Sequence, residues 1–464
     1  MAARKPNAGP EEVDLLLRGC AVVSMDAKGT LIADGAIAVK GRKIHWVGRA
    51  RDAHSRVRAK SVIEAAGMIA MPGMIDAHFH TAQQFLRGKI VALARKRTLK
   101  NPVWKNYYIP FEAMLEPEDV YLSGLIAYTN MIGVGTTCFA EAGGPHPDEM
   151  GRAAMDTGIR GFVALSTIDQ GDWVPPRMMM KTREALKRNV ELVKRWQGNS
   201  RVGAWLALRQ ILVCSPGLIR DIGAAARELD VKIHTHLCEG TYEIDYALEK
   251  FGKRPAEFME ELGVFNRHLH CAHSVLLSPE EMDLYVKRRA SACHCTTNNY
   301  HIGPMRLLEM WRRGVDVGLG TDGAASWGPL DIFQIAHLAR VGQTALFGTP
   351  WHNRTLTSGE EMLAIATRGG ARALGLGDQI GTIEAGRKAD ILLTDCEQLD
   401  QAPLYDPLFT AANTTVGRDV QTVIIDGKVV MKDREILSVD VAEIKAKVAK
   451  RLPGLMRKLE DITR

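Results

Sequence analysis

Histidines and acidic residues, the side chains that bind divalent metals, stand at the ends of short apolar runs in this sequence. His78 and His80 end one such run, His234 and His236 end a second, and Glu239 follows shortly after it. Because alternate side chains of a strand share a face, His78 and His80 are expected to project together as half of a metal site. Glu239 lies just beyond its run, where a carboxylic acid is well placed to transfer protons.

Two more residues supply the remaining ligand types that a hydrolytic divalent metal needs. His273 ends a third apolar run, and we prefer it to the two histidines before it because it lies at the exit of the predicted strand. Asp322 lies in a Gly-Thr-Asp-Gly segment that ends a fourth run. His234 shares the parity of His236 but lies one layer deeper, so we expect it to pack inside the fold.

Eight short apolar segments that alternate with helical patterns are the elements that must position these side chains. Eight such βα units predict a closed (β/α)8 barrel, although an open doubly wound sheet has a similar periodicity. The barrel is favoured because each residue of chemical interest falls at the carboxyl end of its segment, where barrel enzymes place their sites. The predicted strands cover residues 69–80, 136–140, 161–167, 203–211, 231–237, 269–275, 290–295 and 315–320.

The two ends of the chain differ from its middle. Short β-rich runs there are separated by glycines and charged turns, and Asp426-Gly427 is a hairpin signal. We therefore expect an α/β protein in which residues 71–375 form the barrel. Residues 1–70 and 376–464 are expected to build one discontinuous β-sandwich, with a helix at the carboxyl terminus.

Composition excludes several classes of protein. The 464 residues suffice for a barrel and a small second domain. The 60 lysines and arginines against 54 acidic residues make the chain mildly basic, without a nucleic-acid signature. The eight cysteines fall mostly in apolar segments, which fits reduced core thiols and predicts a cytoplasmic location. No apolar run approaches membrane-spanning length, so the expected partner is a small-molecule substrate, with neither nucleic acid nor membrane.

Longer motifs resemble the amidohydrolase superfamily, in the mononuclear branch that includes methylthioadenosine/S-adenosylhomocysteine deaminases, guanine deaminases, triazine hydrolases and phenylurea or thiocarbamate hydrolases. The similarity covers nearly the whole chain, with motifs at residues 67–76, 104–112, 135–137, 320–326 and 386–391. It implies a homo-oligomer and one divalent ion, zinc by preference, with iron, manganese and cobalt as alternatives. By this resemblance the metal ligands are His78, His80, His236 and Asp322, and the catalytic residues are Glu239, His273 and Asp322.

The chain departs from the family pattern around the substrate rather than around the metal. Leu208-Arg209 stands where nucleoside deaminases have a Pro-His pair, and Val103 stands where they have a glutamate that holds ribose. We therefore predict a non-nucleoside substrate, held by aromatic walls that include Tyr108 and by one strong donor, Arg209. Alternatively, Arg209 only bridges buried carboxylates such as Glu141. The predicted substrate contacts are Trp104, Tyr107, Arg209, Asn299 and Trp327.

These observations predict a metal-dependent amidohydrolase that cleaves a C–N bond in a small urea, carbamate or amide, such as a xenobiotic, and releases an amine. Two alternatives use the same centre: a deaminase of an amino-heterocycle or of an adenosine or guanine derivative, and a hydrolytic dehalogenase. Outside enzymes, the alternative is a catalytically dead barrel that acts as a binding protein. Such a barrel is expected to have lost metal ligands, and this sequence retains all of them.

Overall fold

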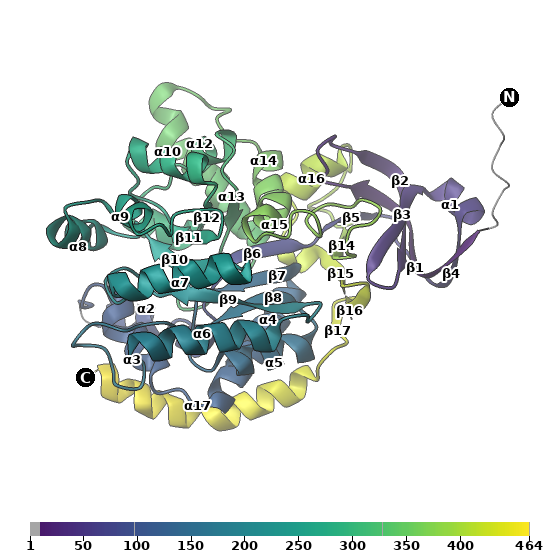
Figure 1. The fold of residues 1–464 in the computed structure, drawn as a ribbon. Helices are drawn as coiled ribbons and strands as arrows, with labels where there is room; N and C mark the ends of the chain where they lie inside the picture. Colours follow the sequence, from purple (N-terminus) through teal and green to yellow (C-terminus); the bar gives the residue numbers. More distant parts are fainter. Residues whose placement is uncertain (1–9, 97, 327, 464) are drawn as a thin grey trace.

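The computed structural model describes residues 10–96, 98–326 and 328–463, and its centre is a barrel of eight parallel strands (Figure 1). The strands follow each other around the sheet in chain order, which confirms the predicted (β/α)8 fold class. The strands are buried, because inward side chains fill the barrel and outward ones meet the helices. They are β6 (Met74–Phe79), β7 (Thr136–Glu141), β8 (Arg160–Ala164), β9 (Val202–Leu208), β10 (Ile233–Leu237), β11 (Leu269–His273), β12 (Ser291–His294) and β13 (Val317–Leu319).

Helices surround the barrel, and polar caps fix where several of them begin (Figure 1). Ser278 caps α10: its hydroxyl accepts the Glu281 N–H at 3.2 Å, and the Glu281 carboxylate accepts the Ser278 N–H at 2.9 Å. The Asp331 side chain likewise accepts backbone N–H groups at the start of α13. The main helices after β6 are α4 (Pro117–Gly133), α5 (Pro147–Thr157), α6 (Thr182–Trp196), α7 (Pro216–Leu229), α8 (Thr241–Phe251), α9 (Pro255–Glu261), α10 (Pro279–Arg288), α11 (Thr296–Ile302), α12 (Leu307–Arg312), α13 (Ile332–Gln343) and α14 (Gly359–Ala364).

Strands from both ends of the chain come together beside the barrel, as predicted, and the structure joins them in one nine-stranded mixed sheet (Figure 1). The single strand predicted over residues 69–80 is instead two strands, of which β5 joins this sheet and β6 the barrel. The chain crosses between them at Gly73, where a Cβ atom would lie 2.0 Å from Thr137 Oγ1. The strands are β1 (Glu11–Val23), β2 (Leu31–Lys40), β3 (Lys43–Arg49), β4 (Val57–Glu64), β5 (Met68–Pro72), β14 (Ile391–Asp395), β15 (Val420–Ile425), β16 (Lys428–Lys432) and β17 (Glu435–Ile436).

A buried ion cluster joins the mixed sheet to the barrel. Arg160, at the start of β8, donates to Asp390 through Nε at 2.7 Å and Nη2 at 3.0 Å. Its Nη2 also donates to Asp426 at 3.0 Å, and all three side chains are buried. Removing one partner would leave an unpaired charge in the interior, so the cluster holds the two parts in one arrangement.

The last helix, α17 (Val441–Thr463), crosses the barrel along the outside of α4 (Figure 1). Arg451 pairs there with the buried carboxylate of Asp119, donating through Nη2 at 2.9 Å. None of the described helices is long and apolar enough to cross a membrane.

The two ends of the barrel sheet, β6 and β13, are joined by hydrogen bonds of one carboxylate and one loop. Asp76 in β6 is fully buried, and its carboxylate accepts the Thr321 N–H at 3.1 Å and the Thr321 hydroxyl at 2.6 Å. The carbonyl of His78 accepts the N–H of Asp322 at 3.1 Å. We call this group of bonds the barrel seam. It holds the loop after β13 against the strand that carries His78.

Replacing Asp76 with alanine is expected to weaken this seam. The Thr321 N–H and hydroxyl would lose their buried acceptor, which costs about 1–3 kcal/mol for each group. In a chain of this size, we expect the thermal midpoint to fall by about 3–6 °C, as measured by differential scanning fluorimetry. Thr321→Val removes only the hydroxyl bond and should give an intermediate midpoint. An Asp76→Ala midpoint equal to that of the wild type would contradict the role of the seam.

Candidate metal centre

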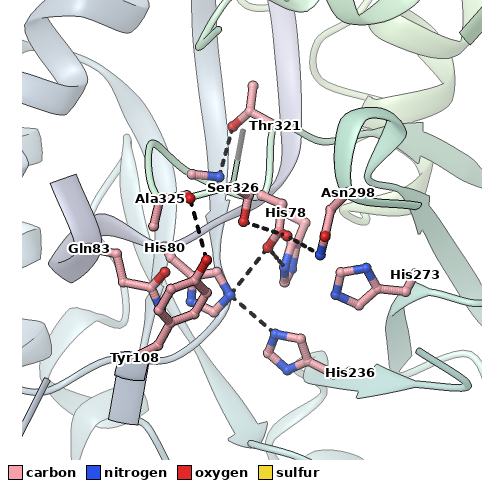
Figure 2. Close-up of polar contacts among 12 residues, drawn as sticks. His78, His80, Gln83, Tyr108, His236, His273, Asn298, Thr321, Ala325 and Ser326 are labelled. Carbon is pink, nitrogen blue, oxygen red and sulfur yellow. Dashed lines mark hydrogen bonds and ion pairs between the residues drawn. The ribbon is translucent and has the colours of Figure 1, made fainter. Parts of the chain in front are cut away.

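The four predicted metal ligands gather at the carboxyl end of the barrel, in two groups that share His78. The ligand atoms of His78, His80 and Asp322 lie within 4.8 Å of one another, and so do those of His78, His236 and His273. His78 lies in β6 and His80 follows it, while His236 lies in β10 and Asp322 follows β13. The Oδ1 atom of Asp322 is 2.9 Å from His78 Nε2 and 3.4 Å from His80 Nε2. The Nε2 atoms of His80 and His236 are 3.2 Å apart, and the imidazoles face one another in Figure 2.

These separations fit a coordination shell. Ligand atoms that lie 2.0–2.1 Å from one ion in a tetrahedral arrangement are about 3.3 Å from each other. The distances from Asp322 to His78 and His80, and from His80 to His236, span 2.9–3.4 Å. Imidazole nitrogen and carboxylate oxygen are also the right donor types for zinc and similar divalent ions. The residues present therefore fit a single divalent metal ion.

Hydrogen bonds fix which nitrogen of each histidine faces the centre. Nδ1 of His236 is 2.8 Å from the carbonyl oxygen of Arg209, which can only accept. Nδ1 therefore carries the proton, and the lone pair of Nε2 is left for a metal. Nδ1 of His78 is 2.8 Å from Nε2 of His234, which is fully buried beneath it. His234 thus orients a ligand from the next layer of the barrel, in the interior position expected for it.

Burial keeps these histidines neutral, as metal ligands must be. It lowers the pKa of His80 and of His236 well below the usual imidazole value, and the Arg209 guanidinium and neighbouring imidazoles add to the effect. In Asp322 the surroundings instead favour the charged form of the side chain. Burial disfavours its charge, but His78, His273 and Ser326 outweigh burial and hold the pKa of this carboxyl below its usual value.

Asp322 offers one oxygen to the centre and anchors the other. Its Oδ2 accepts the Asn298 amide at 2.8 Å and the Ser326 hydroxyl at 2.8 Å. The residue has a φ of 60°, in the left-handed region that non-glycine residues avoid. This turn directs the carboxylate back over the barrel, towards His78.

His273 lies at the edge of the centre rather than in the middle of it. Its Nδ1 donates to Asn299 Oδ1 at 3.0 Å, and its Nε2 lies 3.9 Å from Glu239 Oε1. A nitrogen of His273 also lies within 4.8 Å of ligand atoms of His78 and His236. Burial disfavours the imidazolium, but Cys295 and the carboxylates of Glu239 and Asp322 raise the pKa of His273 well above its usual value. His273 therefore lies beside the ion site, where its Nε2–H can donate a hydrogen bond to a substrate or to water.

Glu239 is held by only one of its oxygens. Oε2 accepts the Tyr242 hydroxyl at 2.9 Å and the Gln210 amide at 3.1 Å. Oε1 faces His273, and 13% of the side chain remains exposed. The Glu239 N–H donates to the carboxylate of Glu243 at 2.9 Å, which fixes the main chain as well. A carboxylate with one anchored and one available oxygen is suited to proton transfer.

A small cavity lies above the centre. About 30 Å³ of it is free, enough for about two water molecules. The cavity is lined by His80, Trp104, Tyr108, Arg209, Gln210, His236, Glu239, His273, Asn298 and Asp322.

Two predicted substrate contacts are displaced by one position from the residues that line this cavity. Tyr108 lines it rather than Tyr107, because Tyr107 is buried and its hydroxyl accepts the Lys100 N–H. Asn298 lines it rather than Asn299, because the Asn299 side chain is bonded to His273.

Trp104 and Arg209 line the cavity, and Trp327 lies outside the described residues. Sequence reasoning missed two other parts of the site. Gln210 directly follows Arg209 at the end of a strand, and Tyr242 lies one helical turn beyond Glu239. Gln210 and Tyr242 could have been identified because they lie so close in the sequence to Arg209 and Glu239.

Arg209 makes its strongest contacts with a carboxylate inside the barrel. Its Nη1 and Nη2 donate to the two oxygens of Glu112 at 2.9 and 3.3 Å, and Nη1 also donates to the Gly143 carbonyl at 3.2 Å. The carboxylate it bridges is Glu112 rather than Glu141, which instead accepts the Thr81 N–H at 2.9 Å. The Arg209 side chain therefore combines a structural ion pair with a place in the cavity wall.

Comparison with known sequences agrees with this geometry. A family model described as the amidohydrolase family matches residues 69–430. A Moorella thermoacetica protein named 5-methylthioadenosine/S-adenosylhomocysteine deaminase is 32% identical over 442 residues, 94% of this chain and 99% of that protein. A protein of the same name from Caldanaerobacter subterraneus is 32% identical over 450 residues, 96% and 99% of the two chains.

Solved structures of other proteins also resemble this chain over nearly its full length. An adenosine deaminase from Xanthomonas campestris with bound zinc has a TM-score of 0.88 and 28% identity, covering 97% of this chain and all of that one. The zinc complex of an atrazine chlorohydrolase from Arthrobacter aurescens TC1 has a TM-score of 0.81 at 23% identity, covering 95% and 100% of the two chains. At that identity, the second likeness shows the fold alone.

Metal content after histidine substitution tests the assignment of the ligands. We expect the purified protein to hold about one ion per chain, and His80→Ala or His236→Ala to hold almost none, because each loses a ligand. His234→Ala should keep the ligands but weaken metal affinity about 10- to 100-fold, as is typical when a ligand loses its orienting partner. Mass spectrometry of the metal after dialysis against a chelator series measures both effects.

His268→Ala is the matched control, because His268 is also buried but bonds the Val231 carbonyl, away from the cavity. Its metal content should equal that of the wild type. Full metal retention in His236→Ala would contradict the proposed ligand set.

Proposed function

This metal-dependent enzyme belongs to the amidohydrolase family, as its motifs predicted, and we propose that it is an aminohydrolase that replaces the amino group of a small nitrogen heterocycle with oxygen. The relatives that support this proposal are named deaminases, and they match nearly the full chain. The observation that carries it is the Glu239 carboxylate, anchored through Oε2 and directed through Oε1 at the edge of the metal centre.

We propose zinc as the ion held by His78, His80, His236 and Asp322. The matching adenosine deaminase structure contains zinc, and the donor set suits it. A bound zinc ion supplies Lewis acidity, which lowers the pKa of water towards about 7.

Glu239 would carry the proton in the reaction. Its Oε1 takes a proton from water as the water oxygen bonds to the ring carbon, and then gives this proton to the departing nitrogen. The C–N bond breaks and the nitrogen leaves as ammonia. The second water proton moves from the newly bonded oxygen to the neighbouring ring nitrogen, which leaves a C=O and an N–H in the product ring. His273, 3.9 Å from Oε1, is placed to hold a polar atom of the substrate through Nε2 during the exchange.

Arg209 favours a substrate with a neutral hydrogen-bond acceptor. The Glu112 carboxylate already pairs with the Arg209 guanidinium, so Arg209 does not need an anionic substrate as its partner. A guanidinium in this state can still donate to a carbonyl oxygen. With Trp104 and Tyr108 as flat neighbours, the wall suits an amino-heterocycle that also carries a ring carbonyl.

The position of Arg209 in the cavity wall also supports a second candidate function, hydrolysis of a urea, carbamate or amide. Such substrates also place a carbonyl next to the bond that breaks, and Arg209 could hold it. The two functions differ in their products: a deaminase releases ammonia and keeps the ring, whereas the second function releases a substituted amine.

A substrate screen separates these candidates. We expect amino-heterocycles with a ring carbonyl to release ammonia, and to be turned over faster than adenosine derivatives, since Val103 offers no acceptor for ribose hydroxyls. Ammonia is scored by a coupled assay and substituted amines by chromatography. Comparable turnover of adenosine derivatives would overturn the substrate argument, and release of substituted amines alone would favour the second candidate.

Glu239→Gln tests the proton-transfer role. The amide keeps the size of the side chain but cannot take up the proton, so kcat should fall about 10²- to 10⁴-fold. Metal content should stay at the wild-type level, because Glu239 is not among the four ligands. A Glu239→Gln variant with wild-type kcat would rule out the proposed mechanism.

A further inference from the structure

The hydroxyl of Tyr242 is the meeting point of three side chains above the metal centre. It lies 2.9 Å from Glu239 Oε2, 2.9 Å from Trp104 Nε1 and 3.2 Å from Gln210 Nε2. Tyr242 is the second residue of α8, so its backbone belongs to a regular helix. The hydroxyl therefore reaches the site from a fixed base.

The direction of these hydrogen bonds is forced. An indole N–H and an amide N–H can only donate, so Trp104 and Gln210 both donate to the Tyr242 oxygen. This uses both lone pairs, and the single hydroxyl proton must go to the Glu239 carboxylate. Burial, together with the carboxylates of Glu239 and Glu243, raises the pKa of Tyr242 well above its usual value, so the phenol keeps this proton.

The same bonds decide which oxygen of Glu239 takes part in proton transfer. Oε2 accepts from both Tyr242 and Gln210, and hydrogen bonds to a carboxylate oxygen make it less basic. Oε1 faces His273 and the cavity. The arrangement therefore leaves Oε1 as the oxygen that exchanges protons.

The third partner connects this arrangement to the cavity wall. Trp104 begins the short helical segment Trp104–Tyr108, and both of these end residues line the cavity. The ring centroid of Trp104 lies 6.2 Å from that of Tyr242 and 5.7 Å from that of Trp173. Trp104 therefore links the Tyr242 hydroxyl to the wall of the cavity.

We propose that Tyr242 is a positioning residue that holds Glu239 through Oε2, directs Oε1 to the reacting atoms, and couples this alignment to the seating of Trp104 over the cavity. The Glu239 carboxylate is then aligned for proton transfer when Trp104 occupies its place in the cavity wall. This inference deepens the proposed aminohydrolase function and rests on it for its kinetic consequence.

Tyr242→Phe is the direct test, because it removes the hydroxyl and keeps the ring. We expect kcat for ammonia release to fall about 10- to 100-fold, the usual effect of losing an orienting partner, while KM changes less than about 3-fold. In crystal structures of the zinc-loaded proteins, the Glu239 carboxylate should leave its wild-type position in this variant.

Tyr246→Phe is the matched control. Tyr246 lies one turn further along α8, and its hydroxyl accepts the Gln170 amide at 3.2 Å, away from the cavity-lining residues. Its removal should change neither kcat nor the position of Glu239. The comparison separates a specific effect at Glu239 from a general effect of losing a tyrosine hydroxyl in this helix.

A double-mutant cycle tests the coupling to Trp104. Trp104→Phe should lower kcat, and the Trp104→Phe/Tyr242→Phe double variant should be no slower than Tyr242→Phe alone, because the indole acts through the missing hydroxyl. Additive losses would overturn the coupling.

An unmoved Glu239 in Tyr242→Phe, or a kcat equal to that of Tyr246→Phe, would overturn the positioning role. If the wild type deaminates no amino-heterocycle but Glu239 moves in Tyr242→Phe, the proposed function fails and the positioning role stands.

Discussion

The site depends on the way in which the barrel closes. β6 and β13 are the two ends of the barrel sheet, and the carboxylate of Asp76 joins them through the main chain and side chain of Thr321. This contact places Asp322 beside His78, so residues 244 positions apart in the chain become neighbours. β10 then needs only to bring His236 to the same depth. The candidate ligands belong to β6, β10 and the loop after β13, which the fold already holds together. A bound ion would therefore tie these elements to one another.

Some of the non-glycine residues with positive φ angles lie around the same centre. His273, Asp322 and Cys238 all have positive φ angles, of 69°, 60° and 53°, at the points where strands turn into loops. Such conformations cost free energy and persist only where the surrounding structure enforces them. Here they turn side chains of the loops back towards the barrel axis. The buried pair Arg209–Glu112 supplies part of the rigid surroundings.

Sequence reasoning found the parts of this architecture that obey short-range rules. The period-two spacing of His78 and His80, and the position of each site residue at a strand end, were sufficient to predict the barrel and the convergence of the ligands. The depth of His234 followed from the same parity argument. In each case, local backbone geometry alone decides where the side chain points.

The remainder depended on contacts between distant residues, which no local pattern contains. The partner of Arg209 is Glu112, 97 positions away, and the choice between Glu112 and Glu141 is made by packing. Tyr107 and Tyr108 are neighbours in a tightly wound segment, so a small change in helical phase decides which one lines the cavity. The sequence did not predict the break between β5 and β6 at Gly73, because apolar residues continue on both sides of it.

The central claim is that three imidazoles and one carboxylate hold a single ion, without help from the buried cysteines nearby. X-ray absorption at the zinc edge of protein loaded with one equivalent of zinc tests this most directly. The account predicts a shell of four protein nitrogen and oxygen atoms and the oxygen of the reacting water, at about 2.0–2.2 Å, with the outer-shell scattering of imidazole rings. A sulfur atom in the first shell, at about 2.3 Å, would contradict it.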